Sequence, residues 1–279
     1  MTETESRSCH GSPRLRIGSL FAGVGGIELG LEWAGVGRTV YQVESDPLCR
    51  RVLAARWPSA ARWADVQDVD PAELPEADVL VGGFPCQGCS VANTTSRAGL
   101  HDPRSGLWEH MGRIAEATRP TWIVVENVAH GWRSWLPRVR RDLGQQGYAT
   151  LPVRLEARHV GLRHVRSRIF LLSHSDGFRL RLDEQRRAAR RAHAVRDQGE
   201  AEPLEHGFER GRNPELPVLA VPHGLPRGLA RPTFRAIGNA VVPQCREIIG
   251  SMIVELIEAG AKARRDENTQ PNRKEIDDE

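Results

Sequence analysis

Residues 15–33 read LRIGSLFAGVGGIELGLEW, and this stretch decides the fold class. A short apolar run ends at Phe21, a glycine-rich turn follows, and apolar residues then recur at helical spacing from Ile27 to Trp33. The order predicts a strand, a tight turn and a helix, as in nucleotide-binding α/β folds. The glycines would let the backbone approach a ligand closely, although a tight turn alone would also need them.

Further strands are expected along the chain. The next one, at 40–43, ends in Glu44, and an acid at that strand end can hold the ribose hydroxyls of a nucleotide-type cofactor. The rhythm continues with expected strands at 77–82, 121–125 and 168–172 and helices at 108–117 and 139–146. Alternating strands and helices predict an α/β fold with a mostly parallel sheet, whose site lies at the carboxyl ends of the strands.

Four polar side chains fall at or just beyond these strand ends: Glu44, Asp65, Cys86 and Glu126. Cys86 follows Gly82-Gly83-Phe84-Pro85, which stops a strand sharply and exposes the next side chain in a loop. A thiolate at this place could act as a nucleophile, and the Glu126 carboxyl could assist it. The pair favours covalent catalysis on an electrophilic ring or carbonyl beside a cofactor.

The cysteines do not predict a metal site. Cys86 and Cys89 form a C-x-x-C pair, but zinc would need a second pair at similar spacing, which the sequence lacks. Cys89 is expected to be a packing residue, with a redox role as the alternative. The polar start of the chain predicts no secretory signal, and no run approaches the roughly 18 apolar residues of a membrane span. We therefore expect a cytoplasmic protein.

The net charge of +3 conceals an uneven distribution of arginine. Residues 133–168 hold nine arginines against two acids, Asp142 and Glu156. A basic stretch within a nearly neutral chain indicates a surface that faces a polyanion. Because the only two lysines among the 39 basic residues are Lys262 and Lys274, a biased composition accounts for the arginines equally well.

Five segments together resemble, in order, the motifs of the DNA (cytosine-5-)-methyltransferases. They read FAGVGG at 21–26, GFPCQ at 83–87, ENV at 126–128, RSR at 166–168 and GNAVVP at 238–243. One such segment is a weak signal, but five in order over most of the chain are specific. The resemblance implies a Rossmann-like, SAM-dependent methyltransferase of the bacterial or phage restriction-modification type, which methylates carbon 5 of cytosine in double-stranded DNA.

The same resemblance implies S-adenosyl-L-methionine as the cofactor and no metal. Glu44 would bind the ribose hydroxyls, and Asp65 would take the adenine amino group. The other implied cofactor contacts are Phe21, Ala22, Gly23, Gly25, Gly26, Pro85, Leu107, Asn239 and Ala240.

The implied chemistry is assigned to four residues. The Cys86 thiolate would add to carbon 6 of a flipped-out cytosine, and Glu126 would hydrogen-bond or protonate ring nitrogen 3. Arg168 would contact the base carbonyl or steady the cysteine, with Arg166 nearby. The basic stretch at 133–168 would meanwhile hold phosphates.

The resemblance also suggests how the chain is divided. We expect a SAM-binding catalytic domain at 1–172, a short, loop-rich target recognition region at 173–230, a returning segment and helix at 231–260, and a charged, disordered tail at 261–279. The recognition region is short by the family's standard and poor in apolar residues, so it can hardly bury a core of its own.

Double-stranded DNA is the expected partner of a monomeric enzyme, with a cognate restriction endonuclease as a candidate partner. One alternative is a tRNA cytosine-5 methyltransferase, although the Cys-Phe-Thr tripeptide typical of those relatives is absent. A second is an inactive nucleic-acid-binding protein on the same fold. A third is a Rossmann-type oxidoreductase that uses Cys86 and Cys89.

Overall fold

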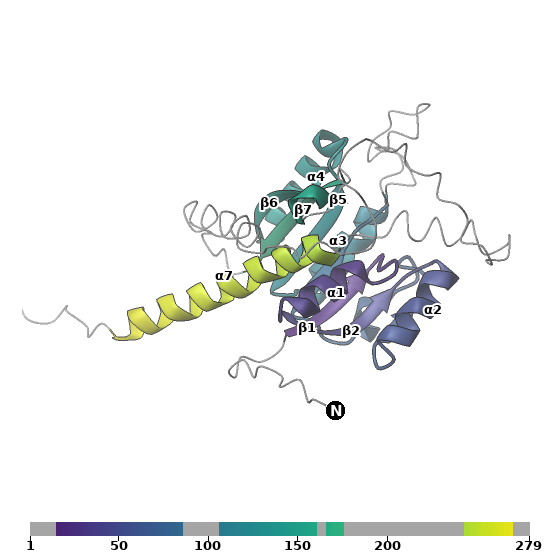
Figure 1. Cartoon of the computed structure of the whole chain (residues 1–279), viewed down its shortest axis with the longest axis horizontal. Coiled ribbons are helices and arrows are strands. Elements are labelled where there is room, and N and C mark those ends of the chain that lie inside the picture. The colour runs from purple at the N-terminus through teal and green to yellow at the C-terminus, as the bar shows by residue number, and fades with distance from the viewer. Residues whose placement is uncertain (1–14, 86–105, 161–165, 176–242, 270–279) are drawn as a thin grey trace, which may run out of the picture.

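One seven-stranded sheet forms the centre of the computed structural model, which describes residues 15–85, 106–160, 166–175 and 243–269 (Figure 1). The strand order is β3-β2-β1-β4-β5-β7-β6. The strands are β1 (Leu15–Leu20), β2 (Gly37–Val43), β3 (Ala61–Trp63), β4 (Val79–Gly82), β5 (Trp122–Val128), β6 (Ala149–Glu156) and β7 (Ser167–His174). Strands β1 to β5 pair in parallel, while β7 runs antiparallel to both β5 and β6. The expected mostly parallel α/β sheet is confirmed.

Helices cover both faces of this sheet. Helices α1 (Gly26–Trp33) and α7 (Pro243–Thr269) pack on one face, and α3 (Leu107–Thr118) and α4 (Trp132–Gln145) pack on the other (Figure 1). Helix α2 (Pro47–Arg56) connects β2 to β3, and two short 3-10 turns lie at Pro71–Glu73 and Ala157–Val160.

Side chains of β5 alternate between the two faces. Val124 lies in the core under α1 and α7, whereas Ile123 and Val125 lie in the core under α3 and α4. The period-2 alternation of a strand therefore puts the next residue, Glu126, on the α1 and α7 side. This placement decides which elements can contact Glu126.

Helix α7 is longer than the amphipathic segment expected at 248–259. It runs from Pro243 to Thr269, and Ile249, Met252 and Ile253 are buried along one side. The expectation of disorder from residue 261 onward is wrong for residues 261–269, which are helical. The segment from 261 to 266 consists mostly of Ala, Lys and Arg, which have high helix propensity even where charge is dense.

Helix α4 also begins earlier than expected, at Trp132 rather than at residue 139. Pro137 lies inside the helix, where it lacks an N–H to donate to the preceding turn. The buried side chains Trp135, Leu136 and Val139 nevertheless share one face, and their burial offsets the lost hydrogen bond.

Strand β6 was not expected from the sequence. Pro152 lies within it, and proline is tolerated because β6 is the outermost strand of the sheet. Leu151 and Val153 are partly buried against the core under α7, while Pro152 and Arg154 between and beyond them are exposed.

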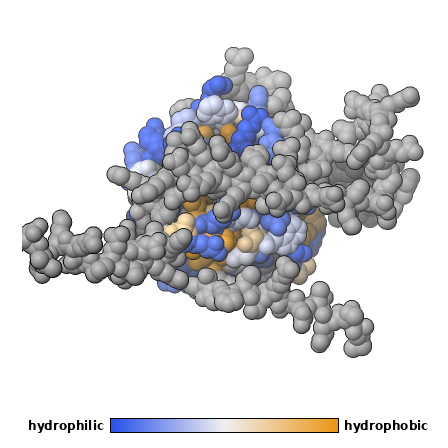
Figure 2. All heavy atoms as spheres, turned by 60° about the vertical axis from the view of Figure 1, so that its left-hand side comes forward, coloured by the Kyte–Doolittle hydropathy of each residue, from blue (hydrophilic) through white to orange (hydrophobic). Residues whose placement is uncertain are grey.

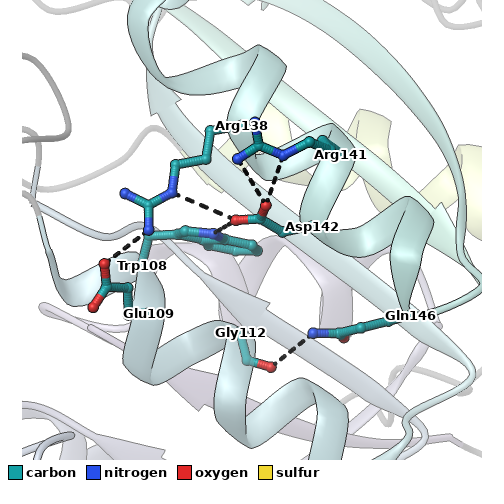
Figure 3. Close-up of polar contacts among 7 residues, drawn as sticks. All are labelled: Trp108, Glu109, Gly112, Arg138, Arg141, Asp142 and Gln146. Atoms are coloured by element: carbon teal, nitrogen blue, oxygen red, sulfur yellow. Dashed lines mark hydrogen bonds and ion pairs between the residues drawn. The ribbon is translucent and has the colours of Figure 1, made fainter.

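Polar contacts join α3 to α4, with Asp142 at their centre (Figure 3). The Trp108 indole N–H donates to Asp142 Oδ2 at 2.9 Å, and Arg138 and Arg141 pair with the same carboxylate. Arg138 also contacts Glu109 at 2.7 Å. These contacts hold the first turn of α3 in place against α4.

The surface of the described residues is mixed in character. On the face drawn in Figure 2, hydrophilic residues cover much of the upper part and apolar residues show in the lower part. The large apolar side chains exposed among the described residues are Trp33, Val52 and Trp132. None of the helices in this part of the chain has the length and apolar content needed to cross a membrane.

Candidate active site

Several of the residues predicted for the site lie along one edge of the sheet. Parallel strands β1 to β5 bring their carboxyl ends to this edge, and antiparallel β7 brings its amino end there. Val128 near the end of β5 lies opposite Arg168 near the start of β7. The edge carries, along the sheet, Asp65, Glu44, the loop at 21–25, the loop at 83–85, Glu126, and Arg166 with Arg168.

The loop after β1 has an unusual backbone conformation. Phe21, Gly23 and Gly25 have φ angles of 56°, 58° and 86°. Positive φ is costly for a residue with a Cβ atom, so glycine suits two of these places, and Phe21 is strained. Ala22 donates its N–H to Val43 O at 3.1 Å, which ties the loop to the end of β2.

Glu44 fixes this loop from the neighbouring strand. Its Oε2 accepts the N–H of Gly23 at 2.7 Å, and its Oε1 accepts the N–H of Asp46 at 2.8 Å. The carboxylate is half-buried and lies beside the turn that opens α1. Glu44 thus lies just beyond the end of β2 and ties it to the glycine loop.

Trp57 supports the same loop and was not predicted from the sequence. A Cβ atom at Gly25 would lie 2.2 Å from the Trp57 ring, so only glycine fits there. The Trp57 indole N–H donates to Glu32 on α1 at 2.9 Å, which fixes the ring. The position of Trp57 just beyond α2 gave no sign of this contact.

The remaining residues predicted to contact the cofactor fall into two groups: those that the structure describes and those that lie outside the described residues. Asp65 lies just beyond β3, where its Oδ1 accepts the N–H of Gln67 at 2.9 Å. Leu107 begins α3 and packs against the core, and Pro85 is half-buried in the loop after β4. The predicted residues Asn239 and Ala240 lie outside the described residues.

Glu126 is the buried carboxylate of the site, with 8% of its surface exposed. Its Oε1 lies 2.8 Å from Arg168 Nε and 3.2 Å from Arg246 Nη2. Arg168, for which a contact with the base carbonyl or the cysteine is predicted, pairs with the Glu126 carboxylate in the structure. Burial, reinforced by the charge of Arg168, lowers the pKa of the half-buried Arg166.

Asn127 connects Glu126 to the loop that leads to Cys86. Its Nδ2 donates to Phe84 O at 3.1 Å, and its Oδ1 accepts the N–H of Val128 at 2.7 Å. A Cβ atom at Gly83 would lie 2.8 Å from Glu126 Oε2, so this loop packs closely against the carboxylate. Cys86 itself lies outside the described residues. Asn127 follows Glu126 in the ENV segment, but the sequence alone gave it no role.

The loop after β1 fits a nucleotide-type cofactor. Gly23 has open space within 4 Å of where a Cβ would lie, and the Glu44 carboxylate is next to it. Open space at a glycine turn beside an acid suits a ribose and its attached chain. Within the described residues, no group of three or more histidines, cysteines or acids could hold a metal ion.

The basic stretch is only partly available to a polyanion. Arg138 and Arg141 pair with Asp142, and Arg154 pairs with Glu156 at 3.0 Å. Arg133 differs: it is exposed, and its guanidinium stacks 4.9 Å from the centre of the exposed Trp132 ring at the start of α4. Trp132 follows closely on the strand that carries Glu126.

Comparison with known proteins shows which family the sequence resembles. The family model for the C-5 cytosine-specific DNA methylase matches residues 15–206. The type II methyltransferase M2.BsuMI of Bacillus subtilis (strain 168) is 36% identical over 171 residues, covering 57% of this chain and 42% of the relative. The type II methyltransferase M.NlaX of Neisseria lactamica is 34% identical over 172 residues, covering 59% and 54%. The chain thus spans about half the length of these relatives.

The solved structures support the same fold. The Dnmt2 methyltransferase of S. pombe superimposes with a TM-score of 0.55 at 19% identity, covering 72% of this chain and 61% of that one. Since the family model spans more than half of the sequence, this chain belongs to the C-5 cytosine-specific DNA methylase family.

Proposed function

We propose that this chain methylates carbon 5 of cytosine in double-stranded DNA, with S-adenosyl-L-methionine as the methyl donor. The proposal rests above all on the buried Glu126 carboxylate, held by Arg168 at 2.8 Å on the sheet edge that also carries the glycine loop. Family membership supports the reaction type. Glu44 and the open loop at Gly23 support the cofactor.

Cys86 is the proposed nucleophile. Its thiolate forms a bond from Sγ to carbon 6 of the ring, and the ring electrons move towards carbon 5. Glu126, oriented by Arg168 and protonated once the substrate is bound, donates that proton or a hydrogen bond to ring nitrogen 3, where charge builds up. The cofactor, when bound, supplies an electrophilic methyl group. Loss of the carbon 5 proton to solvent then returns the electrons and expels the Cys86 thiolate, and ring nitrogen 3 gives any proton it received back to Glu126, which regenerates the enzyme.

The residues of the site also imply how the substrate must approach. A cytosine stacked in a duplex cannot reach an edge as enclosed as that around Glu126, so the base leaves the stack. Arg133, stacked on Trp132, is the described arginine best placed to contact a nearby phosphate. We place this enzyme in the cytoplasm of a bacterial or phage-infected cell, as a monomer, with a cognate restriction endonuclease as a candidate partner.

Nucleoside mass spectrometry tests the proposal. The chain and its Cys86→Ala variant are expressed in a host without cytosine methylation, and plasmid DNA and tRNA are analysed separately. We expect 5-methylcytosine in the DNA with the wild type alone, and bisulfite sequencing would then map its target. A signal in tRNA alone would favour the RNA alternative. No signal in either would overturn the proposal and favour an inactive binding protein.

A further inference from the structure

Arg246 is a buried cation that has no role in the proposed reaction as described above. It lies in the first turn of α7, with 1% of its surface exposed. Its guanidinium lies 4.7 Å from the centre of the Phe170 ring and places Nη2 3.2 Å from Glu126 Oε1. Burial lowers the pKa of Arg246 to about 10, so the group still carries its charge at neutral pH. A buried charge is costly unless it is paired, and Glu126 provides the opposite charge.

The sheet register explains why α7 can reach Glu126. In the antiparallel pairing of β5 with β7, Glu126 lies directly opposite Phe170. Phe170 belongs to the core that α1 and α7 cover, so both side chains point to that face. Arg246 lies three residues before the buried Ile249 and seven before the buried Ile253, and helical spacing directs it to the same face.

Two glycines let α7 approach closely enough for this contact. A Cβ atom at Gly30 of α1 would lie 2.4 Å from the Arg246 Cβ and from the Pro243 carbonyl oxygen. A Cβ atom at Gly250 of α7 would lie 2.5 Å from the Ala34 Cβ. One glycine from each helix thus fixes the start of α7 against α1, and with it the Arg246 backbone.

The two oxygens of Glu126 have different surroundings as a result. Oε1 faces the guanidinium groups of Arg168 and Arg246, whereas Oε2 faces the backbone at Gly83, in the loop that leads to Cys86. Two cations on one oxygen restrain the rotation of the carboxylate more than one cation would. The restraint would keep Oε2 turned towards the Gly83 backbone, which lies three residues before Cys86 in the sequence.

We infer that Arg246 is a positioning residue: together with Arg168 it fixes the orientation of the Glu126 carboxylate and so couples the C-terminal helix to the reaction. This inference rests on the proposed cytosine methylation. It goes beyond it by giving α7 a part in the chemistry, through a residue that does not itself touch the base.

Methyl transfer by three variants tests this role, measured with saturating duplex DNA and varied cofactor. Arg246→Met keeps the length and apolar body of the side chain but removes the charge. We expect kcat to fall about 10- to 100-fold, as for a misplaced catalytic group, while the KM for S-adenosyl-L-methionine changes less than about twofold. Arg246→Lys retains the charge and should recover part of kcat. Met252→Ala, in the same helix and core, destabilises α7 but keeps Arg246, so kcat of its folded fraction should match the wild type.

Two results would overturn the inference: an unchanged kcat in Arg246→Met, or an equal loss of kcat in Met252→Ala. A double-mutant cycle with Glu126→Gln tests the contact without any activity measurement. We expect the unfolding equilibrium constant of the double variant to differ about tenfold from the value calculated by combining the two single effects. Strict additivity would refute the contact. A wild type that methylates no nucleic acid would instead refute the proposed function, and the cycle would still decide the contact.

Discussion

The cofactor side and the catalytic side of the sheet edge are held by different kinds of contact. On the cofactor side, backbone groups dominate: the loop at 21–25 has positive φ angles and donates an N–H to Glu44. On the catalytic side, side chains from two later segments, Arg168 and Arg246, meet the Glu126 carboxylate. Local geometry builds one side and long-range charge pairing builds the other.

The buried acids Glu28 and Glu126 illustrate this difference between the two sides. Glu28, on α1 beneath the glycine loop, is fully buried beside the neutral side chains of Ser19 and Gln42. Glu126 is almost as buried, but two guanidinium groups offset the cost of enclosing its negative charge. The same residue type is therefore enclosed by neutral side chains in one place and by two guanidinium groups in the other.

The largest expected effect is on the catalytic side. Glu126→Gln keeps the size of the side chain but removes both the acid and the charge pairing, so kcat should fall about 10²- to 10⁴-fold. The dissociation constant for S-adenosyl-L-methionine should stay within about threefold, because Glu44 and the glycine loop are untouched. Single-turnover methyl transfer and calorimetry measure the two quantities. Glu109→Gln on α3 is the control, and a parallel loss of cofactor binding in Glu126→Gln would show that the two sides are not independent.

Adding one methyl group at Gly25 should weaken both the stability of the loop on the cofactor side and the affinity for the cofactor. Gly25 and Gly35 both have positive φ, 86° and 78°, but only at Gly25 would a Cβ collide with the Trp57 ring. Gly35→Ala should lower the free energy of unfolding by about 1–2 kcal/mol through backbone strain alone. Gly25→Ala should lose about 1–3 kcal/mol more, and cofactor affinity should fall about tenfold or more.

Denaturant unfolding and cofactor titration of both variants measure these effects. Equal behaviour of Gly25→Ala and Gly35→Ala would mean that Trp57 does not constrain the loop.

The cofactor side was predictable because its signals are local in sequence. A strand, a glycine-rich turn, a helix and an acid at the next strand end follow one another from residue 15 to Glu44, and the structure has them in that order. The start of helix α4 is hard to predict because Pro137, a residue that normally interrupts a helix, lies inside it. Strand β6 is hard to predict because Pro152 lies within it.

The contacts of the catalytic side could be predicted only in part. The motifs located Glu126 and Arg168, but their contact depends on the register of antiparallel β7, which no local pattern reveals. Arg246 had one signal, its spacing to Ile249 and Ile253 on the buried face of α7. A charge normally indicates a surface position, and the nearby Glu126 offsets part of the cost of burying this arginine.

Burial of Glu28 should make the stability of the protein depend on pH. Burial raises the pKa of Glu28 to about 7 from an ordinary 4.5, so the folded protein keeps a proton that the unfolded chain releases. The stability that this provides is fully present below pH 4.5 and is lost as the pH rises through 7, up to about 3 kcal/mol.

Glu28→Gln cannot ionise, so its stability relative to the wild type should increase between pH 5 and pH 8. Denaturant unfolding at the two values measures this change, with the exposed Glu73→Gln as the control. A constant difference between Glu28→Gln and the wild type would mean that Glu28 stays ionised in the fold.

The smallest expected effect is on DNA affinity, and it should differ between two arginines of the basic stretch at 133–168. Arg133 lies exposed on the Trp132 ring, whereas Arg138 is committed to Glu109 and Asp142. Arg133→Gln should weaken duplex binding a few-fold and lower the slope of log affinity against log salt by about one, as for one lost phosphate contact. Arg138→Gln should leave that slope unchanged and cost less than about 1 kcal/mol of stability, since its partners are partly exposed. An equal slope of log affinity against log salt in the two variants would mean that DNA affinity depends on the total charge of the protein and not on which arginines are free of ion pairs.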